Sequence, residues 1–325
     1  MSQGLLQQGL HPDPLVTPLS ASDRAGWTER QRRAYESREM ELFRAALTLP
    51  GTSDVRASVL DDLSAFYGFP AEECVRRCLH WEALSTEEWH AADRTSPEGL
   101  AAFYNSTTSW SFDLLWYAYL ESAGLAYPVA PAVAQVARRA SAGRRHLDFG
   151  SGIGVGSQLF QGLGYETTLA DVSKTLLAFA QFRLERRAIP ARYVDLNDEG
   201  LPHQSFDVIT AIDTLAHVPD VAATASELHK ALVPGGILFA NFDVRPRTRE
   251  NAWHLYEDDL IPRWQLQRAG FEPVLALDGM ITLYRWVNPS DVAHAARGIR
   301  DAVLLRSPLR PAYRRLRGIG VSASG

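Results

Sequence analysis

A glycine-rich segment in the middle of the chain has the residue types and spacing of a ligand-binding turn. His146 to Phe149 reads as the end of a buried strand, and a helix is expected to begin near Ser157. The residues between them include glycines on alternate positions: Gly150, Gly152, Gly154 and Gly156. Glycine is tolerated at this density where the backbone turns sharply or approaches a ligand. A strand, a glycine turn and a helix N-terminus form the first crossover of a doubly wound α/β sheet, the usual site of a nucleotide-like cofactor.

The spacing of the glycines distinguishes between cofactors. A dinucleotide fingerprint requires G-x-G-x-x-G/A, but Val155 or Ser157 occupies the last position in the two registers available here. Asp148 lies two residues before the first glycine, and the resulting pattern Asp-x-Gly-x-Gly-x-Gly resembles the first motif of the class I S-adenosylmethionine-dependent methyltransferases. The resemblance implies that Asp148 and the first three glycines lie against the methionine and ribose part of S-adenosylmethionine.

Two further strand ends extend the resemblance. Residues 165–170 are β-prone and end at Asp171, and residues 191–194 form a short strand that ends at Asp195. The resemblance implies that Asp171 accepts both ribose hydroxyls, that Asp195 accepts from the adenine amino group, and that Leu196 covers the adenine ring. Asp171 has an alternative role as the N-cap of the next helix, although Ser173 also fits that role. Asp195 has an alternative role in a turn before Asn197.

Later segments follow the family's order. Residues 206–212 form a fourth strand that leads to Asp213 and then to Leu215-Ala216-His217-Val218. Many members of the family have Leu-Glu-His here, so Ala216 removes any role that needs that carboxylate. A Pro-Gly-Gly turn at 234–236 precedes a fifth strand, and residues 273–277 and 280–286 read as a closing antiparallel hairpin. Val172 and Ala211, which lie at strand ends of this region, are also expected to contact the cofactor.

The elements that position these residues predict an α/β fold. We expect a doubly wound, seven-stranded, mostly parallel sheet with an antiparallel last strand, preceded by an all-helical lid domain. The predicted organisation is a flexible leader at 1–24, a helical lid and substrate domain at 25–125, a cofactor-binding methyltransferase domain at 126–288 and a basic helical tail at 289–325. Helices are expected at 29–47, 55–67, 70–82, 86–92, 97–120 with a break, and 293–305.

Aromatic and histidine side chains are candidates for the acceptor side of the reaction. Tyr104 and Trp110 lie in an aromatic, hydroxyl-rich segment before the sheet, where aromatic faces attract a sulfonium cation. The alternative is that they only pack the lid on the sheet. His217 follows the fourth strand and is the leading candidate for a general base, with a structural role as its alternative. His254, in the long connection at 243–262, is a second candidate, with a surface position as its alternative.

Composition narrows the class of partner. The net charge of −5 and the isoelectric point near 6.0 give no overall attraction to nucleic acid. Apolar runs end before the length that spans a membrane, and Cys74 and Cys78 fit a reducing cytoplasm. No metal site is expected. The arginines after Pro289 read as a solvated helix face or a homodimer contact, with an anionic partner or membrane surface as the alternative.

These features predict S-adenosylmethionine-dependent methyl transfer to a small-molecule acceptor. Transfer to oxygen, nitrogen or carbon remains open, and tailoring of a secondary metabolite or sugar is the first expectation. One alternative is an NAD-dependent oxidoreductase on a similar fold. The other is a non-catalytic methyltransferase-like binding protein.

Overall fold

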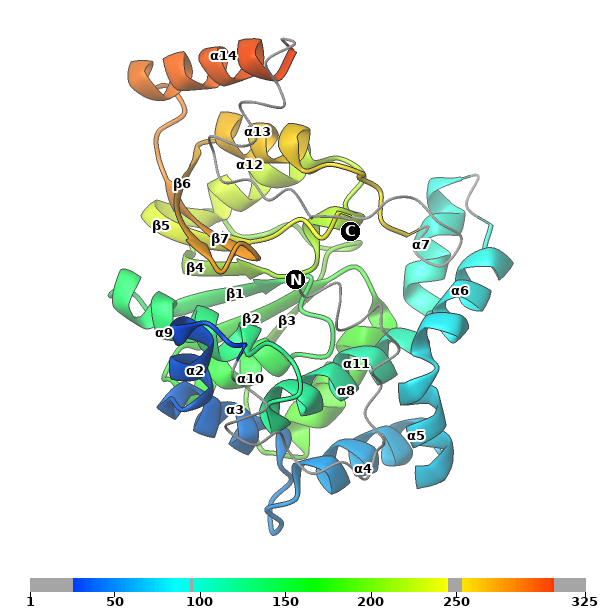
Figure 1. The fold of residues 1–325 in the computed structure, drawn as a ribbon. Helices are drawn as coiled ribbons and strands as arrows, with labels where there is room; N and C mark the ends of the chain where they lie inside the picture. Colours follow the sequence, from blue (N-terminus) through cyan, green and yellow to red (C-terminus); the bar gives the residue numbers. More distant parts are fainter. Residues whose placement is uncertain (1–25, 94–95, 245–252, 307–325) are drawn as a thin grey trace.

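The computed structural model describes residues 26–93, 96–244 and 253–306 of the 325-residue chain. Its strands form one seven-stranded sheet with the order β3-β2-β1-β4-β5-β7-β6 (Figure 1). The strand bounds are β1 Arg145–Phe149, β2 Glu166–Asp171, β3 Arg192–Asp195, β4 Phe206–Ala211, β5 Leu232–Ala240, β6 Phe271–Leu277 and β7 Ile281–Trp286. β1 to β5 pair in parallel, and β7 runs antiparallel to both β5 and β6. The predicted fold class is therefore confirmed.

Helices cover both faces of the sheet. α10 (Val155–Gly162) and α11 (Lys174–Glu185) lie on one face with α9 (Val129–Ala140), while α12 (Val221–Ala231) and α13 (Leu260–Arg268) lie on the other (Figure 1). The strands alternate accordingly: Val208 packs in the same buried cluster as Phe160 of α10, whereas Ile209 packs with Leu228 of α12. Parallel strands that are buried on both faces read as continuous apolar runs, which explains why β4 was predictable from the sequence.

The chain before the sheet is helical in its described residues. Its helices are α2 Glu29–Tyr35, α3 Arg38–Leu47, α4 Val55–Tyr67, α5 Ala71–Leu79, α6 Trp81–Ala91, α7 Pro97–Ser106 and α8 Ser109–Ala123. The single helix expected over 29–47 is instead two, because the Ser37 side chain caps the backbone N–H of Met40 and starts α3. The break expected within 97–120 falls at Thr107 and Thr108, between α7 and α8.

These N-terminal helices share a core with the sheet. Phe43 of α3, Val59 of α4 and Phe112 of α8 belong to the same buried cluster as Val208 and Phe239 of the strands. In Figure 1, α2 to α5 and α8 pack below the face that α10 and α11 cover. The lid is thus held to the sheet by a continuous apolar interior. The domain boundaries at residues 25, 126 and 289 stay a prediction.

The last described helix, α14 (Val292–Arg306), packs on α13. Trp264 Nε1 donates to the Gly298 carbonyl at 3.2 Å, and an Arg297–Glu272 ion pair of 3.2 Å joins α14 to β6.

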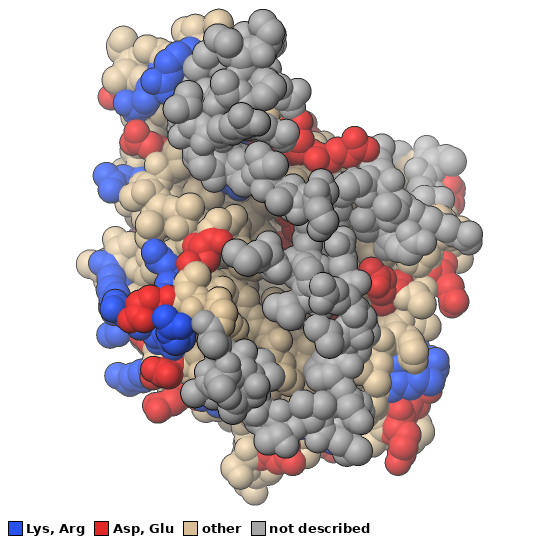
Figure 2. All heavy atoms as spheres, in the orientation of Figure 1, with Lys and Arg blue, Asp and Glu red and all other residues tan. Residues whose placement is uncertain are grey.

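Lys and Arg side chains are interspersed with Asp and Glu on the face shown in Figure 2. The predicted leader and the arginines after residue 306 lie outside the described residues. In the described part of the chain, no helix is long and apolar enough to cross a membrane.

Candidate functional site

A cavity of about 1390 Å³ lies at the carboxyl ends of the parallel strands. Its floor is the glycine turn after β1 and the end of β2. Its walls include α7 and α8, the segments after β4 and β5, and parts of α12, α13, β6 and β7. Among the residues predicted for the site, those that line the cavity are Gly150, Gly152, Asp171, Val172, Leu196, Tyr104, Trp110, His217 and His254. Ligands of open α/β sheets bind at this edge.

The glycine turn is shaped by left-handed backbone conformations. Gly150, Gly152 and Gly154 have φ values of 67°, 52° and 74°. A Cβ on Gly150 would lie 2.2 Å from Cγ2 of Thr214, so only glycine fits between β1 and the segment after β4. Gly154 lies below the cavity and N-caps α10, which therefore begins at Val155, two residues before the expected start. Close packing against the protein thus accounts for part of the glycine pattern.

Asp171 connects the end of β2 to this turn. One carboxylate oxygen accepts from the backbone N–H of Gly152 and the other from that of Ser173, both at 2.8 Å. Burial raises the pKa of Asp171 in spite of these bonds. The helix cap is provided instead by Ser173 Oγ, which accepts from the Leu176 N–H at 3.2 Å. Each carboxylate oxygen can accept a second hydrogen bond, so the predicted contact with a ribose diol is compatible with this geometry.

Asp148 lies beneath the turn and is not among the residues that line the cavity. Its two oxygens accept from Ser157 Oγ and Thr210 Oγ1, both at 2.8 Å, which ties β1 to α10 and β4. Burial raises the pKa of Asp148 to about 6. Thr210 Oγ1 is also 2.9 Å from His146 Nε2, so four buried polar side chains form one network. The observed contacts of Asp148 therefore support the glycine turn, and its contact with the cofactor stays a prediction.

The end of β3 is arranged by a turn. Asp195 accepts from the backbone and side-chain amides of Asn197, at 2.9 and 2.7 Å, and lies 3.2 Å from Lys174 Nζ. Burial raises the pKa of Asp195, but these partners outweigh burial and leave that pKa below its usual value. Leu196 and Asn197 line the cavity, whereas Asp195 does not. The turn role left open for Asp195 is therefore present, and its contact with adenine stays a prediction.

Two residues at neighbouring strand ends, Ile212 and Asn197, line the cavity although the sequence did not predict them there. Ala211 is fully buried within β4, and the next residue, Ile212, lines the cavity instead. Asn197 donates through its side-chain amide to the Val172 carbonyl at 2.7 Å, which joins the ends of β2 and β3 at the cavity. The position of Asn197 two residues after an aspartate was the only local signal for that role.

Aromatic side chains form the wall opposite the sheet. A buried cluster of Trp89, Phe103 and Trp253 joins α6 and α7 to the segment after β5, with ring centroids of Trp89 and Trp253 6.5 Å apart. Trp110 packs on this cluster, 5.5 Å from Phe103, and faces the cavity with Tyr104. Both roles predicted for this segment, packing the lid and facing the ligand, are compatible with the arrangement.

Two histidines meet at this wall. His217 ends the short 3-10 helix η1 (Leu215–His217), and its Nδ1 lies 3.0 Å from the Trp253 carbonyl. His254 Nδ1 lies 2.8 Å from the Asp243 carbonyl, and the two imidazole centroids are 4.8 Å apart. Because a carbonyl can only accept, Nδ1 carries the proton in both rings, and the lone pair of each neutral ring lies on Nε2.

The described residues contain no group of three or more His, Cys, Asp or Glu side chains placed to hold a metal ion. The cavity lining combines the Asp171 carboxylate at the glycine turn with aromatic faces, the two imidazoles, further carboxylates and the Arg263 guanidinium.

Residues 122–276 match the family model of a methyltransferase domain. This segment is a class I S-adenosylmethionine-dependent methyltransferase domain. It contains the glycine turn, Asp171, Leu196 and His217. The family assignment confirms the resemblance found in the sequence and argues against the nicotinamide-dependent alternative.

Curated relatives match part of this chain. The ubiquinone biosynthesis O-methyltransferases of Paramagnetospirillum magneticum and Burkholderia vietnamiensis are each 34% identical, over 92 and 101 residues. These alignments cover 28% and 30% of this chain and 37% and 44% of the relatives, so the chain spans less than half of their length. A solved structure of Haemonchus contortus phosphoethanolamine N-methyltransferase 2 with S-adenosyl-L-methionine aligns with a TM-score of 0.39 and 18% identity, covering 60% of this chain and 48% of that one.

The residues at the cavity of this methyltransferase domain fit S-adenosylmethionine, the cofactor of the family. A carboxylate such as that of Asp171 suits a diol, apolar side chains such as Val172 and Leu196 suit a ring, and aromatic faces such as those of Tyr104 and Trp110 suit a sulfonium; all five residues line the cavity. The individual contacts of these residues with the cofactor are proposals.

Proposed function

We propose that this chain transfers the methyl group of S-adenosylmethionine to an oxygen atom of a small planar acceptor. The observation that carries the proposal is the position of His217 and His254 on an aromatic wall of the cavity that also contains the glycine turn and Asp171. The names of the curated relatives, which are O-methyltransferases, support oxygen as the methylated atom.

The glycine turn and the adjoining strand ends bind the cofactor in this proposal. Asp171 binds the ribose hydroxyls while it continues to accept from the Gly152 N–H. Leu196 and Asn197 flank the adenine, and Tyr104 and Trp110 lie toward the methionine end. S-adenosylmethionine supplies an activated methyl group, so the protein mainly has to hold an acceptor oxygen in line with it and exclude water. Orientation of that kind is worth roughly 7 to 11 kcal/mol.

The acceptor is bound by the aromatic wall. Trp81, Leu100, Trp110 and Trp253 line the cavity and offer flat apolar surface to a planar ring. Because Trp253 belongs to a buried cluster with Trp89 and Phe103, its ring is held in place before any acceptor binds. Because the Trp253 ring is already ordered, stacking an acceptor on it costs little side-chain entropy. A rigid aromatic acceptor also loses little conformational entropy, so the site favours an acceptor of that kind.

His217 acts as the general base in this proposal. A hydroxyl acceptor must lose its proton, and a positioned imidazole contributes typically a hundredfold or more to such a step. The Trp253 carbonyl fixes the proton on Nδ1, so Nε2 of His217 receives the acceptor proton. His254 is the second candidate, with its own Nδ1 held by the Asp243 carbonyl.

Methyl transfer to a panel of acceptors tests the proposal. Purified protein is incubated with S-adenosylmethionine and with catechols, phenols, sugars, amines and acidic carbon compounds, and products are detected by mass spectrometry. A methylated phenol or catechol supports the proposal. Methylation of amines or carbon alone contradicts it, and cofactor binding without any product favours the non-catalytic alternative. Tailoring of a secondary metabolite, a cytoplasmic location and a homodimer contact remain parts of the proposal to be tested separately.

A further inference from the structure

We propose that Asp62 and Arg183 form a positioning pair through which helix α4 sets the conformation of the cofactor-binding glycine turn. The pair joins a helix of the N-terminal lid to the loop after β1, although neither residue lines the cavity. This inference rests on the proposed cofactor site, since it assigns these residues an effect on cofactor affinity. They act through the turn and have no direct contact with the reacting atoms.

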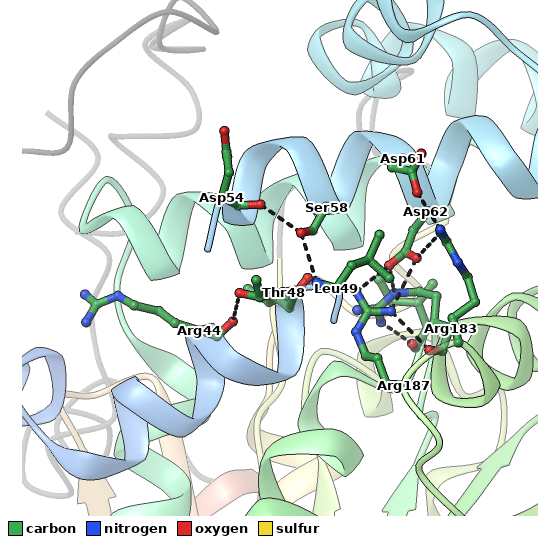
Figure 3. Close-up of polar contacts among 12 residues, drawn as sticks. Arg44, Thr48, Leu49, Asp54, Ser58, Asp61, Asp62, Arg183 and Arg187 are labelled. Carbon is green, nitrogen blue, oxygen red and sulfur yellow. Dashed lines mark hydrogen bonds and ion pairs between the residues drawn. The ribbon is translucent and has the colours of Figure 1, made fainter. Parts of the chain in front are cut away.

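Arg183 is the residue that reaches the turn. Its side chain is fully buried on α11, and Nη1 donates to the Ile153 carbonyl at 2.8 Å. Its Nε donates to Oδ2 of Asp62 at 3.2 Å, so the same guanidinium binds the turn and the lid (Figure 3). A planar guanidinium has several donors in a fixed fork and can make two such contacts at once, whereas an ammonium group is a compact point charge whose donors are all on one atom.

Asp62 is held by more than one arginine. Its fully buried carboxylate also accepts from Arg187 Nη2 at 2.8 Å and from Arg186 Nη1 at 2.7 Å. Arg187 Nη2 further donates to the Leu47 carbonyl at 2.9 Å, at the end of α3. Burial lowers the pKa of Arg183 to about 10, and Asp62 opposes that shift, so the guanidinium stays charged at neutral pH. A buried pair of this kind is strongly disturbed when either partner is removed.

The turn is held at two neighbouring residues. The Gly152 N–H donates to Asp171, and the carbonyl of the following residue, Ile153, accepts from Arg183. Gly152 and Gly154 have positive φ and gain much conformational freedom when released. Because binding to a preformed loop avoids the cost of ordering it, the two anchors together favour cofactor binding. Only Asp171 was predictable from the sequence motif.

Helix α8 connects α4 to the cavity. α4 packs on α8, and Leu114 of α8 lies 2.9 Å from where a Cβ on Gly152 would stand. α8 also carries Trp110 of the aromatic wall. The Asp62–Arg183 pair therefore couples the docking of the lid to the shape of the turn.

The test compares Arg183→Lys and Asp62→Asn with the control Arg186→Lys. Arg186 also binds Asp62, and its second partner is the exposed Asp61. Affinity for S-adenosylhomocysteine is measured by calorimetry, and hydrogen exchange of residues 150–156 is measured in the ligand-free proteins. We expect Arg183→Lys and Asp62→Asn each to weaken binding about tenfold and to speed exchange in the turn, because a charge-assisted bond is lost. Arg186→Lys stays within twofold of the unsubstituted chain in both measurements.

The double variant Asp62→Asn/Arg183→Lys tests whether the two residues act as one unit. If they do, its affinity equals that of the weaker single variant, because the pair is already broken. Folded single variants with unchanged affinity and unchanged exchange in the turn overturn the inference. If Arg183→Lys does not fold, the affinity and exchange measurements on Asp62→Asn, which keeps the side-chain shape, decide the question alone. An unsubstituted chain that does not bind S-adenosylhomocysteine refutes the proposed function, while the exchange comparison still tests the pair.

Discussion

The imidazole rings of His217 and His254 face the same cavity with their centroids 4.8 Å apart, and each ring is anchored through Nδ1 to a backbone carbonyl. Both carbonyls belong to the segment after β5, so this one segment orients His217, which follows β4, as well as His254.

Replacement of His217 tests whether this residue acts as the general base. We expect His217→Ala to lower turnover of an oxygen acceptor at least tenfold while leaving affinity for S-adenosylhomocysteine within twofold, because the imidazole serves the acceptor side. His203→Ala, at an exposed position away from the cavity lining, is the control and should have no effect. Steady-state kinetics and calorimetry measure the two effects. Near-normal turnover of His217→Ala removes this residue from the mechanism.

Asp171 is expected to dominate cofactor affinity. Asp171→Asn replaces one acceptor oxygen by an amide donor, so it loses a hydrogen bond from the turn or from Ser173 as well as the charge that binds a diol. We expect affinity for S-adenosylhomocysteine to fall about ten- to a hundredfold, the equivalent of a lost bond to a charged group. The control is Asp198→Asn, an exposed residue bound to Lys174. Equal affinities of the two variants, measured by calorimetry, contradict the role given to Asp171.

The packing of the glycine turn can be tested through the free energy of unfolding. Gly150 and Gly164 both have positive φ, but a Cβ on Gly150 meets Thr214 at 2.2 Å, whereas a Cβ on Gly164 meets nothing within 4 Å. Gly164→Ala should therefore cost only the backbone strain, about 1 kcal/mol. Gly150→Ala should lower the free energy of unfolding by clearly more and weaken cofactor binding. Denaturant unfolding of both variants measures the difference, and equal losses argue against the observed packing of the turn.

The buried His146 should make the free energy of unfolding depend on pH. Burial lowers its pKa from 6.5 to about 3, so between these pH values the unfolded chain binds a proton that the folded chain does not. The free energy of unfolding consequently falls as the pH drops from 6.5 toward 3, with a contribution of about 1.4 kcal/mol per pH unit from this one group. Above pH 6.5 the contribution is constant.

The variant His146→Gln isolates this effect. It cannot titrate, and it loses the stacking of His146 on Phe160, whose ring centroids are 3.9 Å apart, at every pH. Asp148, whose raised pKa gives the opposite slope, is present in both proteins. We therefore expect the stability difference between the two proteins to shrink as the pH falls below 6.5, measured by urea unfolding. A difference that is independent of pH shows that His146 titrates normally.

Much of the fold was predictable because its signals are local. The strands β1 to β4 are short β-prone segments that lead into turns, and the observed bounds fall within one residue of the predicted ones. β5 differs, because Pro234 to Gly236 continue the strand where a turn was expected. Ser173 was correctly identified as a possible cap of α11, since a cap is decided by neighbouring residues.

The parts of the site that were not predictable depend on long-range contacts. Asp62 and Arg183 are 121 positions apart, and nothing near either residue in the sequence indicates the other. Trp89 and Trp253 likewise meet only because α6 and the segment after β5 converge. Asp195 shows the opposite problem: a family motif suggests a ligand contact, while the side chain is already engaged by Asn197 and Lys174.

Calorimetric titration of the full chain with S-adenosylhomocysteine, and separately with NAD, tests the central claim most directly. The account predicts saturable binding of one S-adenosylhomocysteine per chain, weakened by Asp171→Asn, and no binding of NAD. Binding of NAD without binding of S-adenosylhomocysteine would contradict it.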